Sequence, residues 1–291
     1  MNKIAFMAGL PRSGSSLLSS LLRQNGSVHV SPTSDLCEAV VQIRNNWNTW
    51  DGFRSQKAES LKPRIRCMLR NMMLGFYSEE LSANRLPIDK CRAWPAYIDV
   101  LEDIFCCQVK IICPIRNFPA IVHSFEKLRS ANPLTYPHGR DVSYIANQDV
   151  YGRAMALMAD DGTIGLSARR LIDAIYRGYG DRLIIVPYYE IINNPESVCI
   201  TIFSELGVKP IEVRKDNLKK DNHSYDMEVY GAPLHDVGDK VEQWKVGDLS
   251  DFVLPKDLIE KLNNSFPELQ RLLSYRKLVL GGAVESIAKG R

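Results

Sequence analysis

The sequence predicts an α/β protein with three layers, in which a central, mostly parallel sheet is flanked by helices. Short apolar runs typical of buried strands alternate with longer stretches of helical periodicity, beginning with residues 4–8 and 17–22. A glycine- and serine-rich turn joins that strand to that helix, and a later strand also runs into a turn, at Arg116. Strands that alternate with helices favour a parallel sheet, whose ligands bind at the carboxyl ends of the strands.

The elements are expected in a regular order along the chain. Pro32 and Ser34 mark a turn into a helix, and Gly207 is a stop signal after an amphipathic helix. The predicted strands are residues 4–8, 27–30, 85–89, 109–115 and 182–187. The predicted helices are residues 17–22, 35–46, 61–81, 95–105, 156 or 167 to 179, 195–206 and 258–273. Residues 45–56 are expected to form a loop or lid, and residues 129–148 a mobile loop over a site.

Composition limits the classes of function. The 291 residues are interpreted as a single domain, 1–291, with a flexible tail at about 281–291. A net charge of +3 is too small to imply a nucleic-acid partner, and no apolar run is long enough for a membrane segment. Seven scattered cysteines without a Cys-x-x-Cys pair favour reduced thiols and a cytoplasmic location over a disulfide scaffold or a metal site.

The turn after the first strand has the features of a phosphate-binding loop. Gly9 and Gly14 allow a tight turn in which backbone N–H groups and the positive end of the next helix converge on an anion. The Gly-x4-Gly spacing of nucleoside-triphosphate-binding loops is kept, and Ser16 stands at their Ser/Thr position. Ser15 replaces their Lys, however, and the basic residue lies inside the loop, at Arg12.

This loop resembles the 5'-phosphosulfate loop of sulfotransferases that use 3'-phosphoadenosine 5'-phosphosulfate (PAPS). That loop has the form Pro-[Lys/Arg]-Ser-Gly-[Ser/Thr]-[Ser/Thr]-Leu and stands here as Pro11-Arg12-Ser13-Gly14-Ser15-Ser16-Leu17. The family's second element, a strand ending in Arg with a Ser eight residues later, is matched by Arg116 and Ser124. The Arg form is similar to tyrosylprotein, heparan and many bacterial sulfotransferases. The resemblance covers roughly residues 3–245 and implies a P-loop-like fold.

The resemblance also implies roles for single residues on the donor side. Arg12 and the amides of Ser13, Gly14, Ser15 and Ser16 are expected to hold the 5'-phosphosulfate, and Arg116 and Ser124 the 3'-phosphate. Tyr188 resembles the family's Tyr near the nucleotide. Lys240 lies in a segment similar to the one that closes over PAPS.

The resemblance specifies the catalytic residues less fully than the donor-binding residues. Lys90 looks like the family's Lys that meets the transferring group, where fixed positive charge offsets the negative charge of a loose, in-line transfer. A general base is also needed, and Glu38 is favoured over Asp35, with His123 as a weaker candidate. Asp35 could instead complement the dipole of the helix that it precedes.

The resulting hypothesis is a sulfotransferase that moves a sulfuryl group from PAPS to a hydroxyl or amine acceptor, with PAP as the product and no metal required. The alternative is a P-loop small-molecule kinase that uses ATP and Mg²⁺, kept open by Asp89 after a strand. A non-catalytic nucleotide-binding protein is a third class. The acceptor (peptide tyrosine, sugar, lipid or small phenol) and the oligomeric state stay open. Aromatic residues that could line an acceptor site are Trp47, Trp50, Trp94, Tyr136 and Tyr144.

Overall fold

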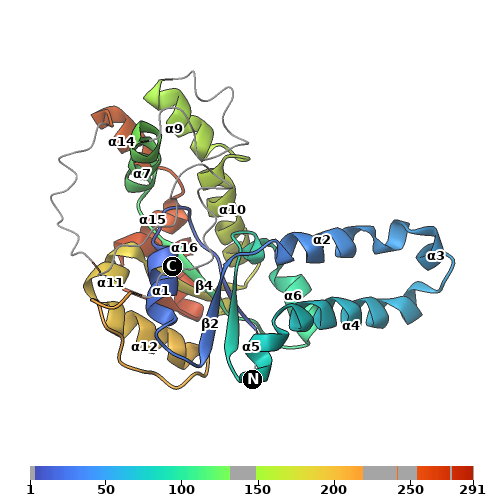
Figure 1. Ribbon diagram of the computed structural model, residues 1–291. Helices are drawn as coiled ribbons and strands as arrows, with labels where there is room; N and C mark the ends of the chain where they lie inside the picture. Colours follow the sequence, from blue (N-terminus) through green and yellow to red (C-terminus); the bar gives the residue numbers. More distant parts are fainter. Residues whose placement is uncertain (1–3, 132–148, 219–240, 242–253, 276, 291) are drawn as a thin grey trace.

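A six-stranded sheet forms the centre of the protein in the computed structural model, which describes residues 4–131, 149–218, 241, 254–275 and 277–290 (Figure 1). The strand order is β2-β3-β1-β4-β5-β6, and all pairs are parallel except β5 with β6. The strands are β1 (Ala5–Met7), β2 (Val28–Thr33), β3 (Leu86–Lys90), β4 (Ile111–Ile115), β5 (Leu183–Pro187) and β6 (Val279–Leu280). The predicted α/β fold is confirmed, and only the two-residue β6 was not predicted.

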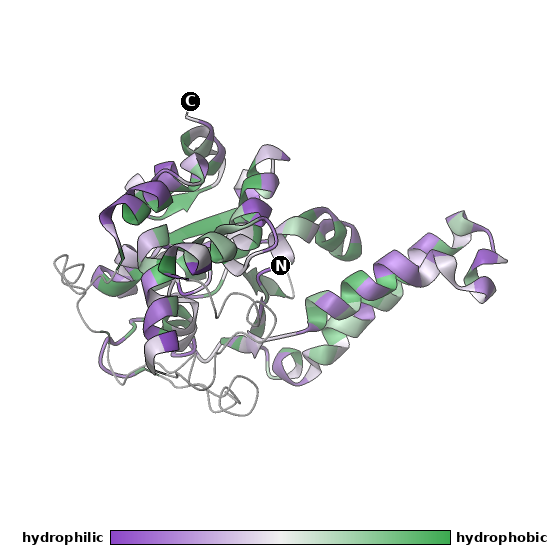
Figure 2. Ribbon diagram, turned by 90° about the horizontal axis from the view of Figure 1, so that it is seen from above, coloured by the Kyte–Doolittle hydropathy of each residue, from purple (hydrophilic) through white to green (hydrophobic). Residues whose placement is uncertain are grey.

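Helices cover both faces of the sheet because its strands are apolar on both sides. Along β1, Phe6 packs into one hydrophobic cluster and its neighbours Ala5 and Met7 into another. Figure 2 shows the strands as mainly hydrophobic, between helices with mixed surfaces. The second cluster is covered by α1 (Ser15–Leu22), α11 (Tyr188–Asn193) and α12 (Pro195–Glu205). The first is covered by α2 (Leu36–Asn46), α4 (Ala58–Phe76), α6 (Ile98–Phe105), α7 (Phe118–Ala131), α9 (Val150–Met158), α10 (Thr163–Tyr176), α14 (Lys256–Asn263), α15 (Pro267–Ser274) and α16 (Gly282–Lys289).

Two helices form an arm, residues 36–76, that projects from the body of the protein in both ribbon views (Figures 1 and 2). α2 and α4 bury apolar side chains between them, among them Val40 and Ile65. The tip contains η1 (Trp47–Thr49) and α3 (Asp51–Arg54). The prediction of a loop or lid at residues 45–56 is therefore wrong, because the ring contact of Trp50 with Phe53 and local helical hydrogen bonds order this tip.

The long predicted helix 61–81 is divided in the structure. α4 ends at Phe76, and α5 (Ser78–Ser82) follows directly. Tyr77 leaves the helical conformation, with φ −107° and ψ 27°, and its side chain is 2% exposed. The break brings the Tyr77 hydroxyl to the buried carboxylate of Asp89, to which it donates a hydrogen bond.

The C-terminal region differs most from the prediction. The predicted helix 258–273 is two helices, α14 and α15, because Phe266 adopts a left-handed conformation (φ 50°) and packs against Phe118. The flexible tail predicted at about 281–291 is wrong for residues 282–289. These form α16, whose Val284 and Ala288 are fully buried, and Arg271 donates a hydrogen bond of 2.6 Å to the Ala288 carbonyl. Of the two starts predicted for the helix that ends at residue 179, the later one, 167, corresponds to α10, and α9 is a separate helix that precedes it.

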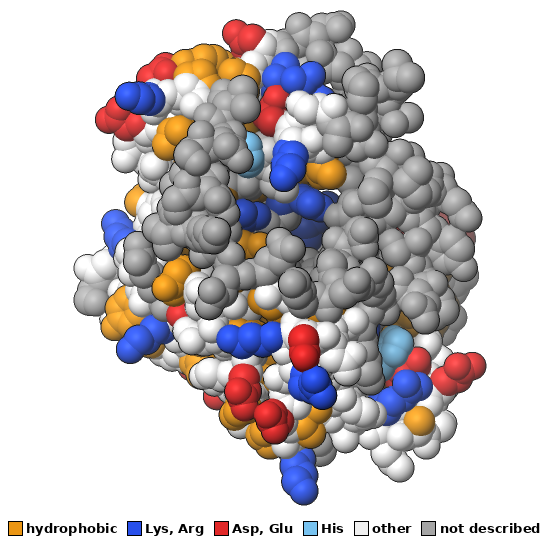
Figure 3. Space-filling model, turned by 60° about the vertical axis from the view of Figure 1, so that its left-hand side comes forward, with side chains coloured by type: hydrophobic (Ala, Val, Ile, Leu, Met, Phe, Trp, Pro, Cys, Tyr) orange, Lys and Arg blue, Asp and Glu red, His pale blue; other side chains and the backbone are white. Residues whose placement is uncertain are grey.

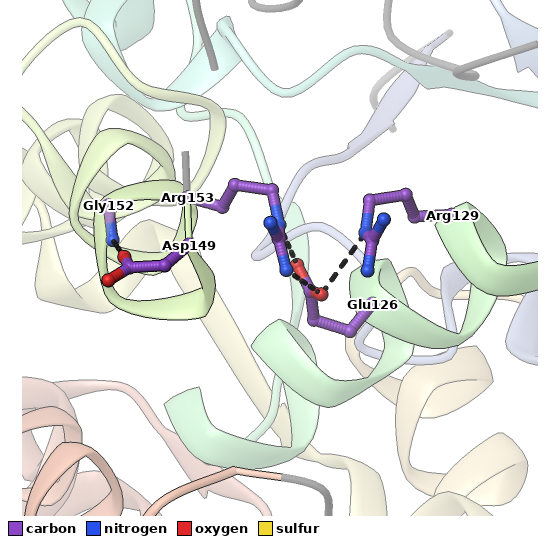
Figure 4. A network of polar contacts seen from close by, with 5 residues as sticks. All are labelled: Glu126, Arg129, Asp149, Gly152 and Arg153. Atoms are coloured by element: carbon purple, nitrogen blue, oxygen red, sulfur yellow. Dashed lines mark hydrogen bonds and ion pairs between the residues drawn. The ribbon is translucent and has the colours of Figure 1, made fainter. Parts of the chain in front are cut away.

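A buried ionic cluster fastens α9 to α7 (Figure 4). The Glu126 carboxylate accepts hydrogen bonds from Nε and Nη2 of Arg153, at 2.8 and 2.6 Å, and from Nε of Arg129 at 3.2 Å. Asp149 caps α9 by accepting from the Gly152 amide at 2.8 Å. A paired charge can be buried at acceptable cost only when its hydrogen bonds are satisfied, as they are for Glu126. The cluster therefore holds the helix that carries Ser124 in place.

Candidate active site

The loop between β1 and α1 is fixed by hydrogen bonds to the neighbouring strand β4. The amide of Ala8 donates to the Ile112 carbonyl at 2.8 Å, and the amide of Leu10 donates to the Pro114 carbonyl at 3.0 Å. The buried hydroxyl of Ser13 is within hydrogen-bond reach of the same Pro114 carbonyl at 2.8 Å, and also of the Leu10 carbonyl. Ser13 therefore stabilises the loop itself through its side chain, which leaves its amide for the role that the resemblance implies.

Two glycines are required by this packing. A Cβ atom at Gly9 would overlap the carbonyl oxygen of Pro114. Gly14 has φ +87°, and a Cβ atom there would lie 2.7 Å from Cδ2 of Tyr188. Arg12 also has a positive φ, 55°, so the loop turns tightly before α1 begins at Ser15. This geometry is that of a backbone cradle at the amino end of a helix, which suits an anion.

The structure brings four predicted nucleotide-binding residues together from three parts of the chain. Nε of Arg12 donates to Oγ of Ser124 at 3.0 Å, and Nη1 of Arg116 donates to the Arg12 carbonyl at 3.1 Å. The Arg116 guanidinium stacks over the Tyr188 ring, 4.2 Å from its centroid. A space-filling view shows Lys and Arg side chains at the floor of a hollow on one face of the molecule (Figure 3).

Arg116 has the character of an anion-binding residue. Its Nε is buried and makes no hydrogen bond within the described part of the chain, and no carboxylate of that part forms an ion pair with it. Burial lowers the pKa of the Arg116 guanidinium from its ordinary value, partly offset by Tyr188. A half-buried positive charge whose buried Nε has no acceptor among the described residues is costly, so an anionic ligand at this position would stabilise the protein.

Lys90 lies at the same end of the sheet. It pairs with Met7 in the β1–β3 register, and its Nζ is 3.5 Å from Oγ of Ser16, as a hydrogen-bond donor. Its own amide donates to the buried hydroxyl of Ser31 at 3.0 Å. The predicted catalytic lysine and the predicted phosphate loop thus meet. Ser31 was not predicted, since a serine at the end of a strand has no distinctive sequence signal.

Asp89 is a second residue whose structural role the sequence did not reveal. It is fully buried and accepts hydrogen bonds from Ser34 (2.6 Å), Trp94 (2.7 Å) and Tyr77. Burial raises the pKa of the Asp89 carboxyl, against the lowering effect of these three donors. Both carboxylate oxygens of Asp89 accept hydrogen bonds from protein donors. The Ser16 hydroxyl lies next to the ammonium group of Lys90. The described residues hold no cluster of three or more His, Cys, Asp or Glu side chains suited to a metal ion.

The candidate bases lie at the start of α2 and are exposed. Oε1 of Glu38 accepts a hydrogen bond of 2.7 Å from Gln42, one turn further along the helix. Asp35 immediately precedes α2, without a side-chain capping bond. His123 is half-buried on α7, next to Ser124. The structure thus places Asp35 and Glu38 beyond the carboxyl end of β2, in a polar and open environment, and does not distinguish between them.

Several predicted site residues separate into other roles. Trp94 is fully buried and donates to Asp89, so it belongs to the core and is not an acceptor-site residue. Trp47 packs against the core at the end of α2, and Trp50 is 48% exposed at the tip of the arm. Lys240, Tyr136 and Tyr144 lie outside the described residues, as does most of the predicted loop 129–148.

Taken together, the sheet, the glycine-bounded loop and the converging arginines define an α/β protein whose strands end, at their carboxyl side, in a geometry suited to an anion. Within this class, the model of a family described as the sulfotransferase family matches residues 5–212. The chain belongs to this family. A search of curated proteins finds no match.

One solved structure agrees with this assignment at the level of the fold. The chain is similar to a sulfotransferase domain from the curacin biosynthetic pathway, with a TM-score of 0.58 and 16% identity over 90% of this chain and 96% of that one. It is also similar to sulfotransferase STF9 from Mycobacterium avium, with a TM-score of 0.48 and 14% identity over 92% of this chain and 76% of that one. No helix among the described residues is long and apolar enough to cross a membrane.

Proposed function

We propose that this sulfotransferase uses PAPS as its sulfuryl donor and transfers the group to a hydroxyl or amine acceptor. The observation that carries the proposal is the meeting of Arg12, Arg116 and Ser124, which come from the ends of β1 and β4 and from α7. A nucleotide with phosphate groups at both its 5' and 3' positions needs two separate anion sites. The loop supplies one, and the unsatisfied Nε of Arg116 supports the other.

The residues present fit the donor. Arg12 and the amides of residues 13–16 would hold the 5'-phosphosulfate, while Arg116 and Ser124 would hold the 3'-phosphate. Tyr188 orients Arg116 through the stacking contact and packs against Gly14. When bound, PAPS supplies an activated sulfuryl group and is released as PAP.

The chain's own contribution to the transfer is fixed charge and proton removal. The ammonium of Lys90 beside Ser16 offsets the negative charge that develops on the bridging and equatorial oxygens. A sulfuryl group carries less charge than a γ-phosphoryl group, so this positive charge suffices without Mg²⁺. We assign removal of the acceptor's proton to Glu38, with Asp35 as the alternative, because both are carboxylates beyond the carboxyl end of β2.

The kinase alternative is not favoured. Kinase loops of this type place a Lys where Ser15 stands, and they hold Mg²⁺ with the Ser/Thr hydroxyl and an acidic strand end. Here Ser16 contacts Lys90, and both oxygens of Asp89 accept hydrogen bonds from protein donors.

Seven cysteines without a disulfide support a reducing, cytoplasmic setting.

The test is turnover with PAPS in the presence of a metal chelator. The purified protein is incubated with PAPS and with phenol, sugar, amine and tyrosine-peptide acceptors, and both PAP release and the mass of each acceptor are measured. We expect PAP to form in step with a sulfated product of at least one acceptor class, at the same rate with or without Mg²⁺. Transfer of phosphate from ATP with Mg²⁺, and none from PAPS, would contradict the proposal.

A further inference from the structure

Both ends of the arm, residues 36–76, meet at one buried carboxylate. The chain enters the arm after Ser34, two residues before α2 begins, and leaves it at Tyr77, directly after α4. Both hydroxyls donate a hydrogen bond to the same oxygen, Oδ2 of Asp89, and the bond from Ser34 is 2.6 Å long. The other oxygen, Oδ1, accepts from Nε1 of Trp94 at 2.7 Å. One side chain therefore joins the two ends of the arm.

The sheet holds this carboxylate in place. Asp89 is fully buried in β3, an inner strand, where it pairs with Phe6 of β1. The Phe6 ring packs edge-on against Trp94, with the ring centroids 4.9 Å apart. A buried polar group that loses its partner is costly. The ends of the arm can therefore move relative to the sheet only at the cost of these hydrogen bonds.

The same carboxylate lies next to the groups that the transfer needs. Asp89 is followed directly by Lys90, whose carbonyl accepts a hydrogen bond of 3.1 Å from the amide of Ser34. Ser34 is followed by Asp35, and Glu38 lies four residues further on, in the first turn of α2. The placement of both candidate bases relative to Lys90 thus depends on how Ser34 is held.

From these shared hydrogen bonds we infer that Asp89 is a positioning residue, which fixes both ends of the arm and thereby sets the start of α2 relative to Lys90. Its part is indirect, because both of its oxygens accept from protein donors. Misplacement of a reacting group by about 1 Å can cost a factor of roughly 10² in rate. The catalytic consequence rests on the proposed function, whereas the clamp formed by Ser34, Asp89 and Tyr77 can be tested without turnover.

Two conservative variants each remove one hydroxyl from the clamp. Tyr77→Phe keeps the buried ring, and Ser34→Ala keeps the backbone amide that donates to Lys90. Ser34→Thr retains a hydroxyl and serves as the rescue. The matched control is Tyr176→Phe, which removes a hydrogen bond of 3.0 Å from an exposed tyrosine of α10 to the Glu268 carboxylate.

The first measurement is amide hydrogen exchange of the full-length protein, followed by mass spectrometry. We expect the first turn of α2, where the Ala39 amide donates to the Asp35 carbonyl, to exchange faster by roughly tenfold in Tyr77→Phe and Ser34→Ala. Exchange in α12 should keep its wild-type rate, and Tyr176→Phe should match the wild type throughout. Unchanged exchange at the start of α2 in both clamp variants would overturn the inference, whichever sulfuryl donor the protein uses.

The second measurement is turnover with PAPS, expressed per nucleotide site counted by calorimetric titration with PAP. A loss of stability alone would remove sites and leave the rate per site unchanged. We expect Tyr77→Phe and Ser34→Ala to lower kcat per site by roughly tenfold at unchanged PAP affinity, and Ser34→Thr to restore it.

Wild-type kcat per site in both clamp variants would overturn the positioning role of Asp89. A wild-type protein that shows no turnover with PAPS would instead contradict the proposed function, and the exchange measurement then decides the inference by itself.

Discussion

The proposed donor side and the proposed acceptor side of the site are built differently. On the donor side, Arg12, Arg116 and Ser124 come from three elements, and each is held by hydrogen bonds to another. On the acceptor side, Asp35 and Glu38 lie at the exposed start of α2, and the partner seen for Glu38 is its own helix neighbour Gln42. A preorganised anion site binds a constant ligand, whereas an open edge can be adapted to different acceptors.

The largest expected effect concerns Glu38 on the exposed acceptor side, and its absence would contradict the comparison between the two sides. If Glu38 is the general base, Glu38→Gln should lower turnover by about 10² to 10⁴ and leave nucleotide affinity unchanged, because the amide cannot accept the proton. Steady-state rates and calorimetric affinities are measured together. Glu59→Gln, at an equally exposed position in the first turn of α4, is the matched control. A fully active Glu38→Gln would transfer the role to Asp35 or His123.

Lys90 tests the junction between the two sides. Lys90→Ala should reduce turnover by roughly 10² to 10³, the cost of removing one preorganised charge from a transition state. Its effect on PAP affinity should be smaller, since the product no longer carries the transferring group. The exposed Lys62→Ala on the arm controls for the general loss of a positive charge. An equal loss in both variants would remove Lys90 from the mechanism.

Arg12 and Arg116 test how the donor side binds the nucleotide. Arg12→Ala and Arg116→Ala should each weaken PAP binding by about 1.5 to 3 kcal/mol, the scale of a hydrogen bond to a charged group. Titration calorimetry measures this directly, with Arg44→Ala, an exposed arginine on the arm, as the control. Unchanged affinity in both variants would remove the PAPS assignment.

The smallest expected effect concerns Asp89, the buried residue next to Lys90, and its contribution to the free energy of unfolding. Because burial raises the pKa of Asp89, the folded protein holds this proton at a higher pH than the unfolded chain, whose value is about 3.8. The free energy of unfolding should therefore fall as the pH rises from below 3.8 to above the folded-state pKa. Asp89→Asn should abolish this component. Urea unfolding of both proteins at several pH values measures it, and identical pH profiles would contradict the account.

The parts of the site that follow from local chain geometry were predictable. The turn from Gly9 to Ser16 and the placement of Arg116 after a strand are local features, and the parallel sheet brings such strand ends together. The Asp89 cluster was not predictable, because Ser34, Tyr77 and Trp94 reach it from separate elements.

The same distinction holds for the fold. The buried strands were evident from their apolar runs, but the division of the C-terminal helices depends on a left-handed Phe266 that packs against Phe118. The burial of Val284 in α16 depends on its neighbours and not on its own segment. Tertiary contacts of this kind override local expectation.

The central claim is that the donor site recognises a 3'-phosphorylated nucleotide without a metal ion. Calorimetric titration of the wild-type protein with PAP, ADP, and ATP with Mg²⁺ tests it most directly. We predict metal-independent binding of PAP that is tighter than that of ADP by more than tenfold, or about 1.4 kcal/mol. Preference for ATP with Mg²⁺ would contradict the account and would restore the kinase hypothesis.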